Sequence, residues 1–368
     1  MVIAHDYLTQ RGGAERVVSV MSRAFPGAPI LTSMFHPVGT FSEFGGADVR
    51  TTSLQRVPFL ASHHRAALPL YAPTFSRITV DTPLLLCSTS GWAHGVQSTG
   101  AKALYVHNTA RWAYQTDEYL NGSYSAARLL AAPMIRPLQR WNRRAASTAD
   151  KIWVNSKAVQ DRVWRNWELD SEVLYPPHSV NVLGSQEPVD GLTPGYLIAV
   201  TRLLHYKRVD VIVEAMRHLP DHQLVVVGEG PEGGRLRNSA PRNCLFLGRV
   251  SDEKLRWLYS NCLALVSAAH EDLGLAPLEA MAFGRPVAVL RRGGFLETVI
   301  EGRNGLFFDE STPEAAARAV RSLVRSRWSS PDITSWADQF SEAAFVDRLR
   351  TSAAELVGDQ LLAGSTVS

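Results

Sequence analysis

Short apolar runs alternate with amphipathic stretches along the second half of the chain. Six runs of four or five residues are rich in Val, Leu, Ile and Phe, a composition typical of buried strands. They lie at 196–200, 224–227, 244–247, 264–267, 286–290 and 305–308. The stretches between them repeat apolar residues at helical spacing and predict helices at 209–218, 232–239, 252–260, 277–283, 294–301 and 312–325. Continuous apolar strands separated by helices predict a parallel sheet covered on both faces.

The first half of the chain repeats this alternation less regularly. It opens with an apolar run at 2–4 and a turn at 10–13, followed by a helical pattern at 14–25. Three further strand-like runs lie at 84–86, 103–106 and 151–154. The expected fold is therefore α/β, with two doubly wound Rossmann-like domains that hold a ligand between the carboxyl edges of their sheets.

The length of the chain and a change of composition near residue 180 predict where these domains divide. The chain has 368 residues, which is more than one hydrophobic core usually holds. Tyr175-Pro176-Pro177 and the Gly- and Pro-spaced stretch 184–195 have the composition of a linker. We expect domains at 1–180 and 181–345. A C-terminal helix and tail at 346–368 are expected to pack back toward the N-terminal domain.

The composition excludes several classes of protein. Charged residues make up 20% and hydrophobic residues 45% of the chain, as in ordinary globular proteins. No apolar run approaches the ~20 residues of a membrane-spanning helix, and the first residues lack the pattern of a signal peptide. Cys87, Cys244 and Cys262 are widely spaced and suit buried, reduced thiols. These features predict a cytoplasmic protein.

Positive charge is concentrated in the first half. Residues 1–180 carry 18 Lys and Arg against 12 Asp and Glu, whereas residues 181–368 carry 20 against 23. The segments 49–80 and 119–149 contain four and five arginines and no acidic residue. Such a surface suits a lipid headgroup or a phosphate-bearing acceptor, and a solvated helix face is the alternative. Nucleic acid is not expected, because the net charge of +3 is modest and no recognition motif occurs.

The loop after the strand at 196–200 carries two cations five positions apart, Arg202 and Lys207. A loop between a strand and a helix lies at the carboxyl edge of the sheet, where the two side chains can converge on a diphosphate. Arg offers a bidentate fork and Lys a point charge. A solvated basic turn is the alternative. The next such loop, at 228–232, has two glycines but lacks the third of a dinucleotide fingerprint, and alone it indicates a generic turn.

Two glutamates, Glu271 and Glu279, flank a predicted helix start. Pro277 suits the first helical position, which would put Glu279 in the first turn and Glu271 on the preceding loop. Free N–H groups at a helix start bind phosphate, and Gly274 permits a close backbone approach. Glu279 could then hold a ribose diol and Glu271 could reach a sugar. The alternative makes Glu279 a capping acid and Glu271 a surface residue.

Two features of the first half point to its own sheet edge. Gly12 and Gly13 form a loop that leads into a helix, where backbone N–H groups could contact a phosphate or a sugar. His107 ends an apolar strand, and the carboxyl end of that strand is expected to face the ligand. A structural histidine is the alternative.

Together these residues resemble the retaining glycosyltransferases of family 4, which have the GT-B fold. The spacing Glu271-x7-Glu279 looks like the paired-glutamate motif of that family, and Arg202 with Lys207 looks like its diphosphate-binding pair. The likeness covers most of the chain. It includes the segments 5–16, 175–177, 228–232, 247–251 and 293–298.

The resemblance implies a role for each of these positions. Glu279 would bind the ribose, Glu271 would face the donor sugar, and Arg202 with Lys207 would neutralise the departing diphosphate. His107 would contact the sugar or the acceptor. The residues expected to meet the base, the sugar or the phosphates, largely through their backbone, are Gly12, Gly13, Gly248, Val250, Gly274, Leu275 and Leu278. The domain 1–180 would bind the acceptor and 181–345 the sugar nucleotide.

The likeness is greatest to bacterial branches that use GDP-mannose to build polysaccharides or glycolipids. It implies a hexose, with mannose favoured, and a glycan or lipid-linked acceptor. The basic segments 49–80 and 119–149 suggest that the protein meets this acceptor as a peripheral protein on the inner face of the cell membrane. Those branches commonly have His-Thr-Pro-Met-Arg-Tyr where this chain has 107–112, His-Asn-Thr-Ala-Arg-Trp. The donor therefore stays open at this point.

No Asp-x-Asp occurs in the chain, and the basic pair can replace a divalent cation, so we expect neither a metal nor a further cofactor. An epimerase or hydrolase on the same fold is one alternative. A non-catalytic sugar-nucleotide binder is another, although such a protein would be expected to lack one of the four charged motif residues. Asn121 begins a glycosylation sequon, which we attribute to chance.

Overall fold

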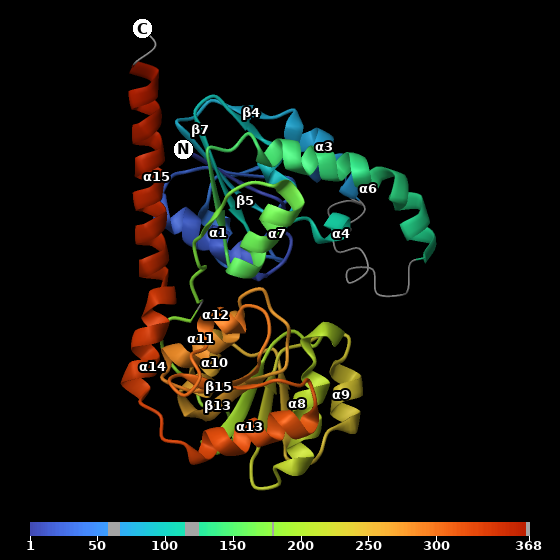
Figure 1. The fold of residues 1–368 in the computed structure, drawn as a ribbon, viewed down its shortest axis with the longest axis vertical. Helices are drawn as coiled ribbons and strands as arrows, with labels where there is room; N and C mark the ends of the chain where they lie inside the picture. The colour runs from blue at the N-terminus through green and yellow to red at the C-terminus, as the bar shows by residue number, and fades with distance from the viewer. Residues whose placement is uncertain (58–66, 115–124, 179, 366–368) are drawn as a thin grey trace. The chain divides into compact units, whose positions relative to one another are not determined.

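The computed structural model describes residues 1–57, 67–114, 125–178 and 180–365 (Figure 1). Asn121 and parts of the arginine-bearing segments 49–80 and 119–149 lie outside these ranges. The chain divides into two compact units. The first unit comprises Met1–Pro176 together with Phe345–Ser368, and the second comprises Pro177–Ala344. The last residues of the chain are thus grouped with the first unit, and the division falls at Pro176, slightly before the expected boundary.

The first unit contains a parallel sheet in the order β3-β2-β1-β5-β7-β8-β9. Its strands are β1 (Val2–His5), β2 (Ile30–Thr32), β3 (Val49–Thr51), β5 (Leu84–Thr89), β7 (Ala101–Val106), β8 (Lys151–Val154) and β9 (Glu172–Val173). A separate pair is formed by β4 (Thr79–Val80) and β6 (Gln97–Ser98). The four longest strands of the main sheet are those that the sequence predicts. The other three have only two or three residues and carry too little pattern to be recognised.

Helices cover both faces of this sheet. They are α1 (Gly13–Ala24), α3 (Leu68–Ser76), α4 (Arg111–Tyr114), α6 (Ser125–Ala146), α7 (Lys157–Trp167) and the part of α15 (Glu342–Ser365) from Phe345 onward, with short 3-10 turns η1 (Ser42–Gly46), η2 (Ser53–Arg56) and η4 (Ala93–Gly95). Val17 and Met21 of α1 share a buried cluster with Leu349 of α15. Trp167 of α7 and Phe75 of α3 belong to the cluster on the other face.

The second unit contains a six-stranded parallel sheet in the order β12-β11-β10-β13-β14-β15. Its strands are β10 (Tyr196–Val200), β11 (Leu224–Val227), β12 (Cys244–Gly248), β13 (Cys262–Ser267), β14 (Val287–Leu290) and β15 (Gly305–Phe308). The sequence predicts all six. The order of the strands reverses between β10 and β13, and ligands of such sheets bind beyond the carboxyl ends at that point.

Most helices of the second unit begin and end close to their expected positions, but α11 and α12 differ and α14 was not predicted. They are α8 (Val209–Ala215), α9 (Gly233–Ser239), α10 (Asp252–Asn261), α11 (Leu275–Ala282), α12 (Phe295–Thr298), α13 (Pro313–Arg325) and α14 (Ser330–Ala337), with 3-10 turns η5 (His205–Lys207), η6 (Met216–His218) and η7 (Asp338–Phe340). Helix α12 ends at Thr298, because Val299 is extended. Helix α11 begins at Leu275, two residues before the expected Pro277.

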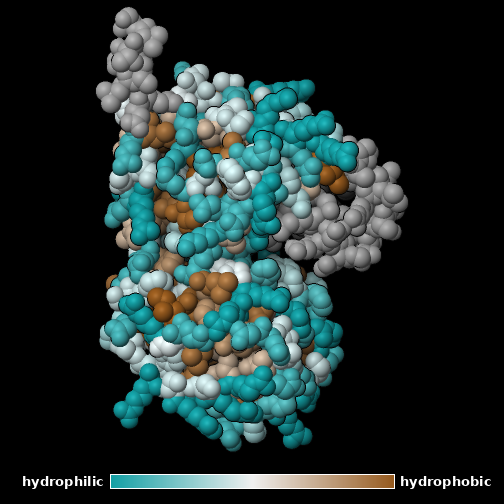
Figure 2. Space-filling model, viewed as in Figure 1, coloured by the Kyte–Doolittle hydropathy of each residue, from teal (hydrophilic) through white to brown (hydrophobic). Residues whose placement is uncertain are grey.

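The surface of the two units is mostly polar. Figure 2 shows a largely hydrophilic face with apolar side chains in small groups. Among the large apolar residues that are exposed are Val38, Leu183 and Leu296. Within the described residues, no helix is both long enough and apolar enough to span a bilayer.

Candidate active site

The carboxyl edge of the second sheet brings some of the predicted donor-site residues into neighbouring loops. Arg202 and Lys207 follow β10, and Glu271 follows the adjacent strand β13. A small pocket at this edge is lined by Lys207, Glu271, Gly274 and Pro277, among others. The two motifs are 64 positions apart along the chain, and the reversal of strand order between β10 and β13 is what makes them neighbours.

Lys207 and Glu271 form an ion pair in this pocket. The Nζ atom of Lys207 donates to Oε1 of Glu271. The Lys207 side chain is only 11% exposed and that of Glu271 25%, so water screens the pair less than it would a surface pair. An ammonium group has three N–H donors, which leaves Lys207 able to bind a further anion. The pair also fixes the Glu271 carboxylate at the edge of the sheet.

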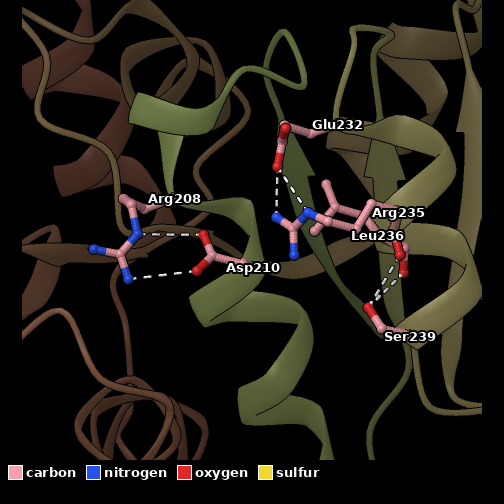
Figure 3. Close-up of polar contacts among 6 residues, drawn as sticks. All are labelled: Arg208, Asp210, Glu232, Arg235, Leu236 and Ser239. Atoms are coloured by element: carbon pink, nitrogen blue, oxygen red, sulfur yellow. Dashed lines mark hydrogen bonds and ion pairs between the residues drawn. The ribbon is translucent and has the colours of Figure 1, made fainter. Parts of the chain in front are cut away.

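Arg202 is exposed, and no partner of its guanidinium is found within the described residues. Other arginines near this edge are already paired (Figure 3). Arg208 binds Asp210 at 3.3 and 3.4 Å, and Arg235 binds Glu232 at 2.9 and 2.5 Å. Arg202 is therefore a bidentate donor that no carboxylate among the described residues occupies.

The glycine loop after β11 supports the Arg202 loop. A Cβ atom on Gly228 would lie 2.0 Å from the carbonyl oxygen of Thr201, and one on Gly230 would lie 2.3 Å from that of Leu203. The amide of Leu203 donates to Glu229 O at 2.9 Å. The loop at 228–232, which by sequence resembles a generic turn, thus packs backbone against backbone on the loop that carries Arg202.

Gly248 and Val250 lie at the end of β12. Gly248 has φ +66°, and its carbonyl oxygen accepts from the amide of Gly228 at 2.8 Å. Val250 is half-buried. The next residue, Ser251, caps α10 by accepting from the amide of Lys254. The turn is therefore fixed at both ends, which suits the predicted contact between its backbone groups and a ligand.

The start of α11 differs from the sequence prediction. Gly274, at φ +86°, is the residue before the helix, so Pro277 is the third helical residue rather than the first. Proline has no N–H, so the free donors of the first turn are those of Gly274, Leu275 and Ala276. Leu278 is fully buried and contributes no side chain to the edge. The early start is possible because glycine adopts a positive φ without strain.

Glu279 is consequently in the second turn of α11, and not in the first as expected. It is 7% exposed, and its Oε2 accepts from the hydroxyl of Tyr259 at 2.7 Å. Burial and this carboxylate raise the pKa of Tyr259 well above its ordinary value, so the tyrosine remains a donor. His178 is also near: burial lowers its pKa, and the Glu279 charge opposes that shift. A ribose diol at this position would meet a carboxylate that Tyr259 already orients.

Sequence reasoning did not identify Tyr259 and His178 as part of this arrangement. Tyr259 occupies an apolar position of α10 and has the pattern of a core residue. His178 follows the two prolines at the start of the second unit, where nothing marks it as close to Glu279. Only the packing of α10 against α11 reveals the contact.

In the first unit, His107 follows β7 and is half-buried. Its Nε2 lies 2.7 Å from Oγ of Ser88, at the end of the neighbouring strand β5. Burial, and secondarily His5, lower the pKa of His107 to about 3. The imidazole is therefore neutral at physiological pH.

Gly12 and Gly13 lie at the start of α1, as predicted. Gly13 is the first helical residue, and a Cβ atom there would enter open space. A Cβ on Gly12 would lie 2.5 Å from Oε2 of Glu15. Glu15 is 2% exposed and burial raises its pKa. The start of α1 therefore lies against the carboxyl group of Glu15. This group leaves little room for a side chain at position 12.

Asp6 is a buried acid that sequence reasoning did not single out. Its carboxylate accepts from the amides of Ser90, Trp92 and Ala93 at 2.7, 3.1 and 2.7 Å. It therefore holds the loop that follows β5, which adjoins Ser88. Sequence alone shows only an acid after the first strand, which is no guide to these partners.

Comparison with known proteins finds a family model that matches part of the chain. Residues 186–344 match the family described as Glycosyl transferases group 1. The chain is 26% identical over 188 residues to an uncharacterized glycosyltransferase of Methanocaldococcus jannaschii, which covers 50% of this chain and 52% of that protein. It is 37% identical over 135 residues to a GDP-mannose-dependent alpha-(1-6)-phosphatidylinositol dimannoside mannosyltransferase of Mycobacterium tuberculosis, with 35% of each chain covered. The matches thus span about half of these relatives or less.

Solved structures resemble the whole chain. Anabaena HepE in complex with UDP and glucose has a TM-score of 0.68 at 17% identity, with 96% of this chain and 99% of that chain covered. Sucrose-phosphate synthase from Thermosynechococcus elongatus has a TM-score of 0.69 at 18% identity, with 98% and 100% covered. Identities this low establish the fold alone, and they confirm the predicted GT-B class with two Rossmann-like sheets.

Proposed function

We propose that this chain transfers a hexose from a nucleoside diphosphate sugar to a hydroxyl group, because residues 186–344 match the family of group 1 glycosyl transferases and the chain has a GT-B fold. The observation that supports this proposal is the arrangement of residues at the carboxyl edge of the second sheet. There Lys207 and the start of α11 line one pocket, and Arg202, which is exposed, lies in the same loop as Lys207. Cations and N–H donors gathered at one place suit a diphosphate.

In the proposed reaction the anomeric configuration is retained. The bond between the anomeric carbon and the diphosphate oxygen breaks, and a bond to the acceptor oxygen forms on the same face. The acceptor proton passes to the departing diphosphate. Arg202 and Lys207 stabilise the charge that develops on this leaving group. Glu271, held by Lys207, faces the sugar and stabilises positive charge there instead of forming a covalent bond.

We propose GDP-mannose as the favoured donor. A relative named as a GDP-mannose-dependent mannosyltransferase supports mannose, whereas a similar fold was solved with UDP and glucose. A panel of GDP, UDP and ADP in thermal unfolding tests this choice. We expect GDP to raise the unfolding temperature most. A larger shift with UDP would overturn the donor assignment, and no shift with any nucleotide would overturn the proposed function.

We further propose that transfer requires no divalent metal, because the chain lacks Asp-x-Asp and offers two cations to the diphosphate instead. Turnover measured with and without excess EDTA tests this. Equal rates are expected. A loss of activity that Mg²⁺ restores would contradict the proposal.

The acceptor is proposed to be lipid-linked and reached at a membrane surface. Arg136, Arg140 and Arg144 are exposed at four-residue intervals, and therefore on one face of α6. Such a stripe attracts anionic headgroups. Sedimentation with vesicles of anionic phospholipid at low salt should pull the protein down, and vesicles of neutral phosphatidylcholine should not. Equal sedimentation with both would remove this part of the proposal.

The alternative is a hydrolase or epimerase that acts on the same sugar nucleotide. Both reactions would use the donor edge of the second unit, so binding assays do not separate them. Product analysis does. Free hexose or an epimerised sugar nucleotide, formed at the same rate whether or not an acceptor is present, would favour the alternative.

A further inference from the structure

Three polar side chains at the carboxyl edge of the first sheet form a hydrogen-bonded chain. His5 ends β1, Ser88 lies near the end of β5, and His107 follows β7. The Nδ1 atom of His5 is 3.1 Å from both the carbonyl oxygen and the Oγ of Ser88. Oγ of Ser88 is 2.7 Å from Nε2 of His107. Strand register places these residues together, since His5 pairs with Ser88 across β1 and β5.

The direction of these hydrogen bonds follows from what each atom can do. A carbonyl oxygen only accepts, so Nδ1 of His5 carries a proton, whether that ring is neutral or charged. It therefore cannot accept from Ser88. The Ser88 hydroxyl is fully buried, and Nε2 of His107 is the acceptor left for its proton among the contacts of the described residues. A buried hydroxyl with no acceptor would cost free energy, so Ser88 donates to His107.

We infer that Ser88 and His5 are positioning residues that hold His107 as the neutral tautomer with its proton on Nδ1. His107 then acts in the proposed transfer as a hydrogen-bond donor to a sugar oxygen, and not as a base. Its Nε2 is occupied by Ser88, and its Nδ1 already carries a proton. The hydrogen bond from His107 to a sugar oxygen rests on the proposed function. The assignment of the tautomer rests only on the hydrogen bonds within the first unit.

The surroundings of the ring favour the neutral form. His5 on β1 and Tyr105 on β7 face it edge-on, with ring centroids at 6.4 and 5.1 Å. Burial raises the pKa of Tyr105, so it brings no negative charge to stabilise an imidazolium. The described contacts of the His107 side chain use Nε2 and the ring faces and leave Nδ1 without a hydrogen bond. Nδ1 is therefore the atom that a ligand can meet.

The tautomer can be observed directly in the full chain without any substrate. Protein labelled with ¹⁵N-histidine is studied by long-range ¹H–¹⁵N correlation, and His107→Gln identifies the His107 signals. We expect a protonated Nδ1 and an unprotonated Nε2 whose shifts stay constant between about pH 5.5 and 8. A proton on Nε2, or titration near the ordinary value of about 6.5, would overturn the inference.

Variants separate positioning from folding. Ser88→Ala should mix the two tautomers of His107 and lower kcat about 5- to 10-fold, the scale of one hydrogen bond. Nucleotide-induced thermal stabilisation should be unchanged. Ser88→Thr keeps the hydroxyl and should restore the single tautomer. Ser90→Ala is the matched control, because the described contacts of Ser90 involve its backbone only.

The outcomes distinguish two failures. If Ser88→Ala leaves a single Nδ1-protonated tautomer, Ser88 does not position His107 and the inference is wrong. If the wild-type tautomer is as expected but no sugar nucleotide is turned over, the proposed function fails while the assignment of the proton stands.

Discussion

At the scale of single residues, the donor edge depends on which charges are already paired. Arg202 and Arg208 lie six positions apart in one loop, yet within the described part of the chain only Arg208 has a carboxylate partner, Asp210. Arg208 is the residue before α8, and its partner Asp210 lies two positions further on, in the first turn of that helix. Whether an arginine of this loop can bind a ligand thus depends on the carboxylates near it as well as on its residue type.

Arg202→Ala should lower kcat/KM by about 100-fold, because one preorganised donor to developing charge is worth that order of rate. Arg208→Ala is the matched control and should change kcat/KM less than about threefold, since its partner Asp210 is exposed enough for the pair to be worth little. Steady-state kinetics with the sugar nucleotide measure both. Equal losses in the two variants would contradict the assignment of Arg202.

Tyr259→Phe should destabilise the second unit by about 1.5–3 kcal/mol, because it removes a donor from the buried carboxylate of Glu279. Tyr196→Phe provides the comparison: that hydroxyl donates to the uncharged carbonyl of Leu258 at 2.9 Å, so about 1 kcal/mol is expected. Urea unfolding measures both free energies. A larger loss for Tyr196→Phe would show that Tyr259 does not support Glu279.

At the scale of elements, the sequence predicts the second unit better than the first. Its six strands are continuous apolar runs, and such runs are recognisable because both faces of a parallel sheet are buried. Strands β2, β3 and β9 lack that length. The start of α11 was misplaced because Pro277 marks a common first position, whereas Gly274 permits an earlier one. The contact of Tyr259 with Glu279 depends on packing between two helices, which no local pattern encodes.

Gly228→Ala should displace the loop that carries Arg202. Gly228 has φ +128°, and an added Cβ would lie 2.0 Å from the carbonyl oxygen of Thr201, so the backbone must shift. We expect destabilisation and weaker nucleotide binding together. Gly234→Ala in α9 is the control, since its Cβ meets nothing within 4 Å, and a helical alanine should stabilise by about 0.5–1 kcal/mol. Unchanged nucleotide affinity in Gly228→Ala would show that this glycine does not shape the site.

At the scale of the whole molecule, the chain returns to its first unit at the end. Phe345, Leu349 and Ala353 of α15 are buried in the cluster that contains α1, and Arg350 donates to the carbonyl of Ala24 at 2.8 Å. The first unit therefore completes its core only with residues that follow the second in sequence. Each unit has its own buried cluster, so a defect in one is expected to leave the other folded.

Leu349→Ala tests this division of the molecule. The side chain is fully buried, and its truncation should cost about 2–5 kcal/mol in the first unit. The nucleotide would still bind, because the cations of the donor edge belong to the second unit. Calorimetry should therefore show one transition moved to lower temperature, while added nucleotide still raises the other. Arg348→Ala, at an exposed position of the same helix, should move neither. A single transition that shifts as a whole in Leu349→Ala would mean that the units unfold together and that α15 stabilises both.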